Sequence, residues 1–270
     1  LNLVDNKISG SATSTGSFGT LEIPGKFILD SNSRISLSNN DASDKTTLFG
    51  FEAGSLIASG DDENTMIGHQ AGLRTTGGYN TYVGADAGLG ASGADSFNVG
   101  VGRSSLFAVT TGNQNTVIGN RSGLSLTTGI KNVFIGSNAG NGTTDVDNTV
   151  IIGETAAIAN MTSAADGTVA IGKTSLTALT SGIGNVAIGS GSMAANATSD
   201  FNVAIGTNTL GKLTNDGTTA NTAVGYKAAE TMTTGTKNTA VGYEALKSCD
   251  DGLNNTALGY QALTADAGNN

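Results

Sequence analysis

The stretch Asn221-Thr222-Ala223-Val224-Gly225-Tyr226-Lys227-Ala228-Ala229 decides the fold of this chain, because its nine-residue pattern recurs thirteen times from Thr46 onward. The fifth position is a glycine in every copy, and successive central glycines lie 16 to 19 residues apart, most often 17. They are Gly50, Gly68, Gly84, Gly102, Gly119, Gly136, Gly153, Gly172, Gly189, Gly206, Gly225, Gly242 and Gly259. A short repeat at nearly constant spacing predicts a solenoid, in which each coil stacks on the previous one.

The composition supports an ordered repeat and excludes several classes of function. Charged residues make up 13% of the 270 residues, and the single proline, Pro24, precedes the repeats, where it removes no donor from a β-ladder. The net charge of −9 disfavours nucleic acid, whose phosphates would be repelled. No apolar run is long enough for a membrane-spanning helix, and Cys249 alone cannot form an intrachain disulfide.

The first five positions of each copy read as a short β-strand that ends at the central glycine. Alternate side chains point to opposite faces, so the second and fourth positions share one face and the third lies on the other. The fourth position is always large and apolar, and the second is always Thr or Val. We assign this face, for example Thr239 and Val241, to the interior of the coil, because β-branched residues suit a buried pleated surface.

The third position is also apolar in every copy, which predicts a second buried face. A lone coil has one interior, so an identical chain is the simplest cover for an apolar stripe of this length. We therefore expect a homo-oligomer whose chains approach more closely where the third position becomes alanine. The predicted interface stripe is Ala170, Ala187, Ala204, Ala223, Ala240 and Ala257.

Two residue types punctuate each coil. Glycine at the fifth position permits a tight turn after the strand, because glycine adopts positive φ freely. Asparagine occupies the first position in ten of the thirteen copies. Its side-chain amides are expected to stack as a ladder from coil to coil.

The chain divides where the repeats begin. Residues 1–45 are expected to form a joining or capping segment with short strands at 26–29 and 35–37, and residues 46–270 the repeat solenoid. At a strand spacing of about 4.8 Å, the stacked coils would form a rod of roughly 60 Å. Because an open end invites uncontrolled pairing, we expect a further domain or another protein beyond Asn270.

The Asn-Thr-Ala-Val-Gly-Tyr repeats, together with segments 9–19 and 31–41, resemble tail-fibre and adhesin-like proteins of bacterial viruses, especially marine ones. The copies at 167–172 and 185–189 are also similar to the heads of trimeric autotransporter adhesins. The resemblance covers nearly the whole chain. It implies an all-β, left-handed parallel β-roll that forms a homotrimer on a virion or outside the cell. Its partners would be a virion or surface attachment protein at one end and a host cell-surface glycan or protein.

No group of residues in the sequence indicates catalysis. His69, the only histidine, occupies a variable sixth position, and Cys249 precedes two aspartates that would raise a thiol pKa. The segment 88–93 matches a dinucleotide fingerprint by its letters, but no helix signal follows it. We therefore predict no catalytic residue and no cofactor, and we predict that the protein is not an enzyme.

Two acidic segments, 61–63 and 145–147, have the oxygen ligands of a cation site, although solvated turns are the simpler interpretation. We predict no metal site. Glycan hydrolysis needs two carboxylates held about 5 to 10 Å apart, and no such pair stands out. The regular threonines, assigned above to the interior, argue against ice or mineral binding.

Tyr226, Tyr243 and Tyr260 share the sixth position of three successive coils, so they should form one stripe. A tyrosine offers an apolar ring and a polar tip, which suits contact with a sugar or a protein. We predict a receptor-contact stripe here, with shielding of the turn as the alternative. The predicted function is a fibre that spans distance and mediates attachment to a host surface. The alternatives are a spacer without a receptor and a glycan-depolymerising tailspike.

Overall fold

The computed structural model describes residues 3–4, 7–8, 46–57, 63–90 and 93–264. Contacts divide the chain into two units, Leu1–Ser36 and Leu37–Asn270. In the first unit, β1 (Leu3–Val4) pairs antiparallel with β2 (Lys7–Ile8). The strands predicted at 26–29 and 35–37 lie outside the described residues. The repeats belong to the second unit.

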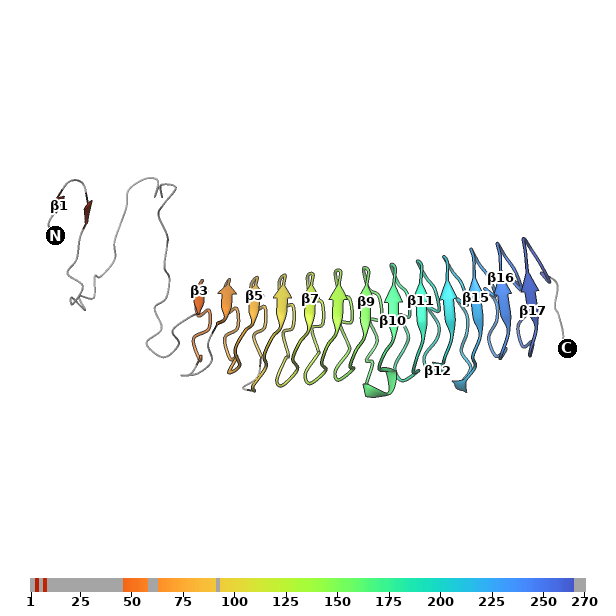
Figure 1. Ribbon diagram of the computed structural model, residues 1–270, viewed down its shortest axis with the longest axis horizontal. Helices are drawn as coiled ribbons and strands as arrows, with labels where there is room; N and C mark the ends of the chain where they lie inside the picture. The colour runs from red at the N-terminus through yellow and green to blue at the C-terminus, as the bar shows by residue number, and fades with distance from the viewer. Residues whose placement is uncertain (1–2, 5–6, 9–45, 58–62, 91–92, 265–270) are drawn as a thin grey trace. The chain divides into compact units, whose positions relative to one another are not determined.

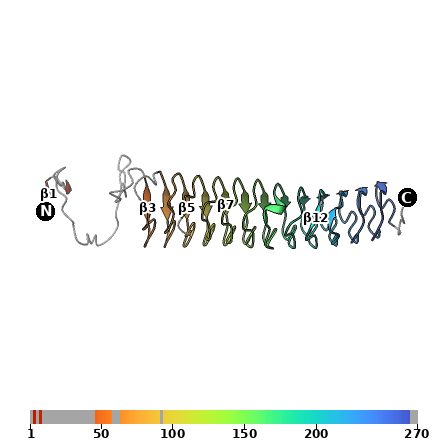
Figure 2. The same cartoon turned by 90° about the horizontal axis from the view of Figure 1, so that it is seen from below.

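The second unit is a parallel β-solenoid, as the repeat spacing predicts, and its coils follow one another along a rod (Figures 1 and 2). Each motif copy contributes one strand of three residues to a single sheet of thirteen strands. The strands are β3 (Thr47–Phe49), β4 (Thr65–Ile67), β5 (Thr81–Val83), β6 (Val99–Val101), β7 (Thr116–Ile118), β8 (Val133–Ile135), β9 (Val150–Ile152), β10 (Val169–Ile171), β11 (Val186–Ile188), β13 (Val203–Ile205), β15 (Thr222–Val224), β16 (Thr239–Val241) and β17 (Thr256–Leu258).

Equivalent motif positions lie opposite each other in every adjacent pair of these strands, for example Ala223 and Ala240. Outside the sheet, β12 (Ser199–Asp200) pairs with β14 (Gly217–Thr218), and η1 (Ser163–Ala165) forms one turn of 3₁₀-helix. The longer spacings of the repeat are thus absorbed away from the sheet. The left-handed winding of the coils that the resemblance implies stays a prediction.

The central glycines are required for two reasons. Their φ angles lie between +123° and +143°, a region that other residues rarely adopt. In addition, a Cβ atom added to Gly189 would lie 2.4 Å from the carbonyl oxygen of Gly206 in the next coil. The predicted turn role is confirmed, and the close approach of successive coils adds a second constraint.

The asparagine ladder is also confirmed, and it connects more than neighbouring coils. The backbone N–H of Asn115 donates to Oδ1 of Asn98 at 3.0 Å, and Nδ2 of Asn115 donates to the carbonyl of Gly129 at 2.8 Å. Most of the buried amides therefore link the adjacent coil to the second turn of their own coil. Nδ2 of Asn202 donates to the carbonyl of Asp200 instead, and Nδ2 of Asn255 has no hydrogen-bond partner among the described residues. Thr149 and Thr168 interrupt the ladder, because their hydroxyls donate instead to the carbonyls of Asp147 and Ala165.

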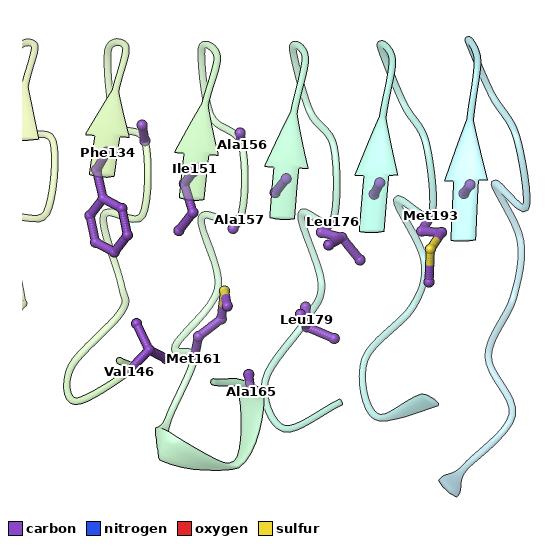
Figure 3. Packing of buried hydrophobic residues seen from close by; sticks show 14 of the residues in the cluster. Phe134, Val146, Ile151, Ala156, Ala157, Met161, Ala165, Leu176, Leu179 and Met193 are labelled. Carbon is purple, nitrogen blue, oxygen red and sulfur yellow. The ribbon is translucent and has the colours of Figure 1, made fainter. Parts of the chain in front are cut away.

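The interior of each coil is filled by side chains of complementary size at the third and ninth positions. Where the third is bulky the ninth is glycine, or alanine in the case of Ile151 and Ala157, and where the third is alanine the ninth is usually leucine or methionine. Examples are Tyr82 with Gly88, Phe134 with Gly140, Ala170 with Leu176, and Ala187 with Met193. Figure 3 shows Phe134 and Ile151 extending from their strands, whereas Leu176 and Met193 extend from the neighbouring segment.

The fit at these pairs is tight. A Cβ atom on Gly88 would lie 2.5 Å from the ring of Tyr82, and one on Gly140 would lie 2.9 Å from the ring of Phe134. Ala223 and Ala229 are an exception, since both are small. Each coil thus encloses its own dense core. From coil to coil the large side chain moves between the third and the ninth motif positions, and the interior stays filled.

Candidate functional site

The two faces of the strands are the reverse of those predicted. In every strand of the large sheet the third motif position is the most buried, and the second and fourth are partly or fully exposed. The sequence predicts correctly that the two faces of each strand alternate. The prediction of which face lies inside the coil is wrong, because all three positions are apolar or β-branched.

The predicted oligomer-interface stripe is therefore wrong. Its six alanines are at most 2% exposed within a single chain and line the interior of their own coils: Ala170, Ala187, Ala204, Ala223, Ala240 and Ala257. The change from bulky residues to alanine compensates for the larger ninth-position residues. It does not reflect a closer partner chain.

A flat apolar surface lies on the outside of the sheet instead, and we call it the outer sheet face. It consists of two columns of side chains, Thr or Val at the second position and Ile, Val, Leu or Phe at the fourth. At about 4.8 Å per coil and roughly 10 Å width, the face covers on the order of 600 Å², the upper end of what monomers expose. A surface of this size on a rod indicates an interaction site.

The regular threonines belong to the outer sheet face, contrary to the prediction that they face inward. They are Thr65, Thr81, Thr116, Thr222, Thr239 and Thr256. The five successive coils from β8 to β13 carry valine at that position and isoleucine at the fourth. The middle of the face therefore has no side-chain hydroxyl, and its character is mainly apolar.

The tyrosines at the sixth position form the predicted stripe. The ring centroids of Tyr226 and Tyr243 are 5.2 Å apart, those of Tyr243 and Tyr260 are 5.3 Å apart, and both pairs are stacked. The three residues are 43%, 44% and 72% exposed, so the stack presents a continuous aromatic edge to solvent. Its role in receptor contact stays a prediction.

Charged side chains lie alongside this stripe. Lys227 Nζ is 5.6 Å from the centroid of the Tyr226 ring and 3.2 Å from Glu230. Glu244 accepts hydrogen bonds from Lys247 at 2.6 Å and from Gln261 at 2.9 Å, which together lower its pKa. Exposed pairs of this kind contribute little to stability. They give the stripe fixed polar groups beside its rings.

The other residues singled out from the sequence do not form a catalytic site. His69 stacks on Phe51 with centroids 5.7 Å apart, and its Nδ1 lies 3.4 Å from Asp86. Cys249 is buried in the core of its coil. In the segment 88–93, Gly88 and Gly90 belong to a turn with positive φ, and residues 91–92 lie outside the described residues.

The acidic residues after Thr144 take part in backbone hydrogen bonds. Asp145 accepts from the N–H of Ser163, Asp147 from that of Ile130, and Asp166 from that of Asp147, at 3.1, 2.8 and 2.7 Å. Partial burial, followed by the neighbouring carboxylates, raises the pKa of Asp166. Within the described ranges no group of three or more His, Cys, Asp or Glu could hold a metal ion. Most of segment 61–63 lies outside them.

No family model, curated protein or solved structure matches this chain. In the part of the chain that the structure describes, no helix is long and apolar enough to cross a membrane. Two surfaces thus remain as candidates for function, the outer sheet face and the tyrosine stripe.

Proposed function

We propose that this chain is the rod of a homotrimeric fibre, on a virion or cell surface, that spans distance and attaches to a host surface. The observation that supports the proposal is the outer sheet face, an exposed apolar surface with the same two columns in every coil. The resemblance of the repeats to viral tail fibres and trimeric adhesins supplies the number of chains and the location.

An identical chain is the cover that fits this face best. Because the coils stack in register, a second copy presents the same columns at the same spacing along its whole length. Alignment of the rods about a common axis would bury the aliphatic residues of every coil at once. At about 25 cal/mol per Å², covering roughly 600 Å² per chain would contribute on the order of 15 kcal/mol before the cost of association.

Native mass spectrometry of the purified chain tests the assembly, and we expect the mass of three chains. A variant with Ile171→Lys, Ile188→Lys and Ile205→Lys adds charge at the centre of the outer sheet face and should yield monomers that retain the circular dichroism of a β-solenoid. The matched control places three lysines on exposed second-turn positions, Thr111, Thr128 and Ser163, and should remain trimeric. A wild-type chain that is monomeric at micromolar concentration would contradict the proposal.

Attachment is tested separately at the tyrosine stripe. Changing Tyr226, Tyr243 and Tyr260 to serine removes the exposed rings while leaving the coil interiors intact. We expect the trimer to persist and adsorption to host cells to fall at least tenfold. If adsorption is unchanged, the stripe is a structural stack, and a spacer without a receptor becomes the better description.

Binding to ice or mineral is a second candidate, because the threonines face outward. The central coils lack hydroxyls at the equivalent positions, which favours an apolar partner over ordered water. Ice-affinity purification of the wild type and of the variant with Ile171→Lys, Ile188→Lys and Ile205→Lys distinguishes ice binding from assembly with an apolar partner. Retention of the wild type on ice, lost in the variant, would favour this second function.

A further inference from the structure

A positively charged zone occupies the coils of β6 and β7, although the chain as a whole is acidic. Residues 96–144 contain no Asp or Glu, and they include Arg103, Arg121 and Lys131, whereas the chain carries a net charge of −9. An open hollow of about 310 Å³ lies in this zone. It is lined by Asp86, Arg103, Ser104, Phe107, Arg121 and Leu124.

The solenoid brings the two arginines of the hollow together. The N–H of Arg121 donates to the carbonyl of Arg103 at 2.9 Å, so the two side chains leave the backbone from directly adjacent coils. Both residues are exposed, and among the described residues neither guanidinium makes an ion pair or a side-chain hydrogen bond. Two unpaired forks of N–H donors side by side can hold one carboxylate or sulfate group.

The rest of the lining is suited to a sugar ring. Phe107 is 37% exposed, and Leu124 occupies the equivalent position of the next coil, where its carbonyl accepts from the N–H of Ala108 at 3.1 Å. Together they form an apolar wall beside the arginines. Asp86, the acidic residue of the lining, lies 3.4 Å from His69 and is a hydrogen-bond acceptor for hydroxyl groups.

From this arrangement we infer that the hollow binds an acidic saccharide. Its carboxylate or sulfate group lies between the guanidinium groups of Arg103 and Arg121, and one face of its ring packs against Phe107. The inference rests on the proposed attachment function and specifies the chemical class of the surface ligand. It also places a contact on the same edge of the rod as the tyrosine stripe, because Arg103 shares the sixth motif position with the tyrosines.

Calorimetric titration of the full chain with three oligosaccharides of equal length tests the inference. The probes are a polyuronate, a sulfated neutral sugar and the same neutral sugar without sulfate. We expect at least one acidic probe to bind at least tenfold more tightly than the uncharged one, with affinity that falls as salt is added. The tighter of the two acidic probes identifies carboxylate or sulfate as the recognised group.

The variant Arg103→Gln/Arg121→Gln should weaken binding of that probe at least tenfold, and Phe107→Ser should weaken it without changing the salt dependence. Arg74→Gln/Lys212→Gln removes the same charge outside the hollow and should leave affinity within twofold. Equal binding of the uncharged probe, equal loss in the control, or absence of acidic-probe binding would overturn the inference. In the last case, continued adsorption of the trimer to host cells shows that the attachment function survives without this site.

Discussion

At the scale of the residue, the central glycine is determined by contact between coils as well as by its φ angle. We expect Gly189→Ala to lower the free energy of unfolding by about 3 kcal/mol or more. About 1–2 kcal/mol of this comes from the positive φ, and the remainder from the clash with the Gly206 carbonyl. Gly259→Ala is the matched control, because Gly259 occupies the same motif position with a similar φ of +123°, and among the described residues nothing lies within 4 Å of the added Cβ. Urea unfolding should show the smaller loss for the control, and equal losses would refute the contact.

Also at the residue scale, Tyr82 should make stability depend on pH in alkaline solution. Its hydroxyl donates to Oδ2 of buried Asp95 at 2.5 Å, and burial, followed by the charge of Asp95, raises the pKa of Tyr82 well above its ordinary value. Because the folded pKa exceeds the unfolded one, this contribution is complete below about pH 10 and is lost as the pH rises further.

The difference between the tyrosinate absorbance of wild type and that of Tyr82→Phe, followed against pH, isolates this group. We expect the ionisation of Tyr82 to coincide with loss of the β-sheet circular dichroism. Ionisation with the sheet still intact would show that the phenol is accessible to water.

At the scale of the element, the sequence predicted the strands, their register, the turn glycines and the amide ladder, because each depends on a residue type at a fixed interval. It did not reveal which face of the strand is inside. A strand of three residues with Val, Ala and Ile has no polar side to mark the solvent. The signal that could have settled the question is the exchange of sizes between the third and ninth positions, which only residues sharing one interior would show.

This exchange predicts strong coupling within a single coil. Ala187→Phe should overpack the coil and Met193→Gly should leave a cavity, each lowering the free energy of unfolding by about 2 kcal/mol or more. The double variant reproduces the pairing of Phe134 with Gly140, so we expect it to recover part of the loss, with a coupling energy of about 1–3 kcal/mol. The control combines Ala187→Phe with Met232→Gly, a cavity in a coil that is not adjacent, and its effects should add.

At the scale of the whole molecule, one edge of the rod changes chemistry along its length while the core stays the same. The sixth position carries Arg103 within the positively charged zone and tyrosines in the last three coils. The hollow and the aromatic stripe were not equally visible in the sequence. The tyrosines repeat at identical motif positions, whereas the lining of the hollow combines three motif positions from three coils, which only the stacked coils bring together.

The interruption of the amide ladder should divide the rod into two cooperative blocks. On both sides of the interruption, the backbone N–H at the first motif position donates to the side-chain oxygen of an asparagine in the preceding coil. At the interruption, Thr149 supplies no amide oxygen to the N–H of Thr168, and Thr168 supplies none to the N–H of Asn185. In a stack of repeats, stability is set by each coil and by its contact with the next, so a weaker junction should open first. Hydrogen exchange is therefore expected to be faster at Thr168 and Asn185 than at Asn115 and Asn221.

Thr168→Asn should restore the acceptor and slow exchange of the Asn185 amide by up to about tenfold, the value of one buried hydrogen bond. Thr168→Val removes the hydroxyl without adding an amide and should give no such protection, so equal protection in the two variants would show that the ladder does not hold the coils together.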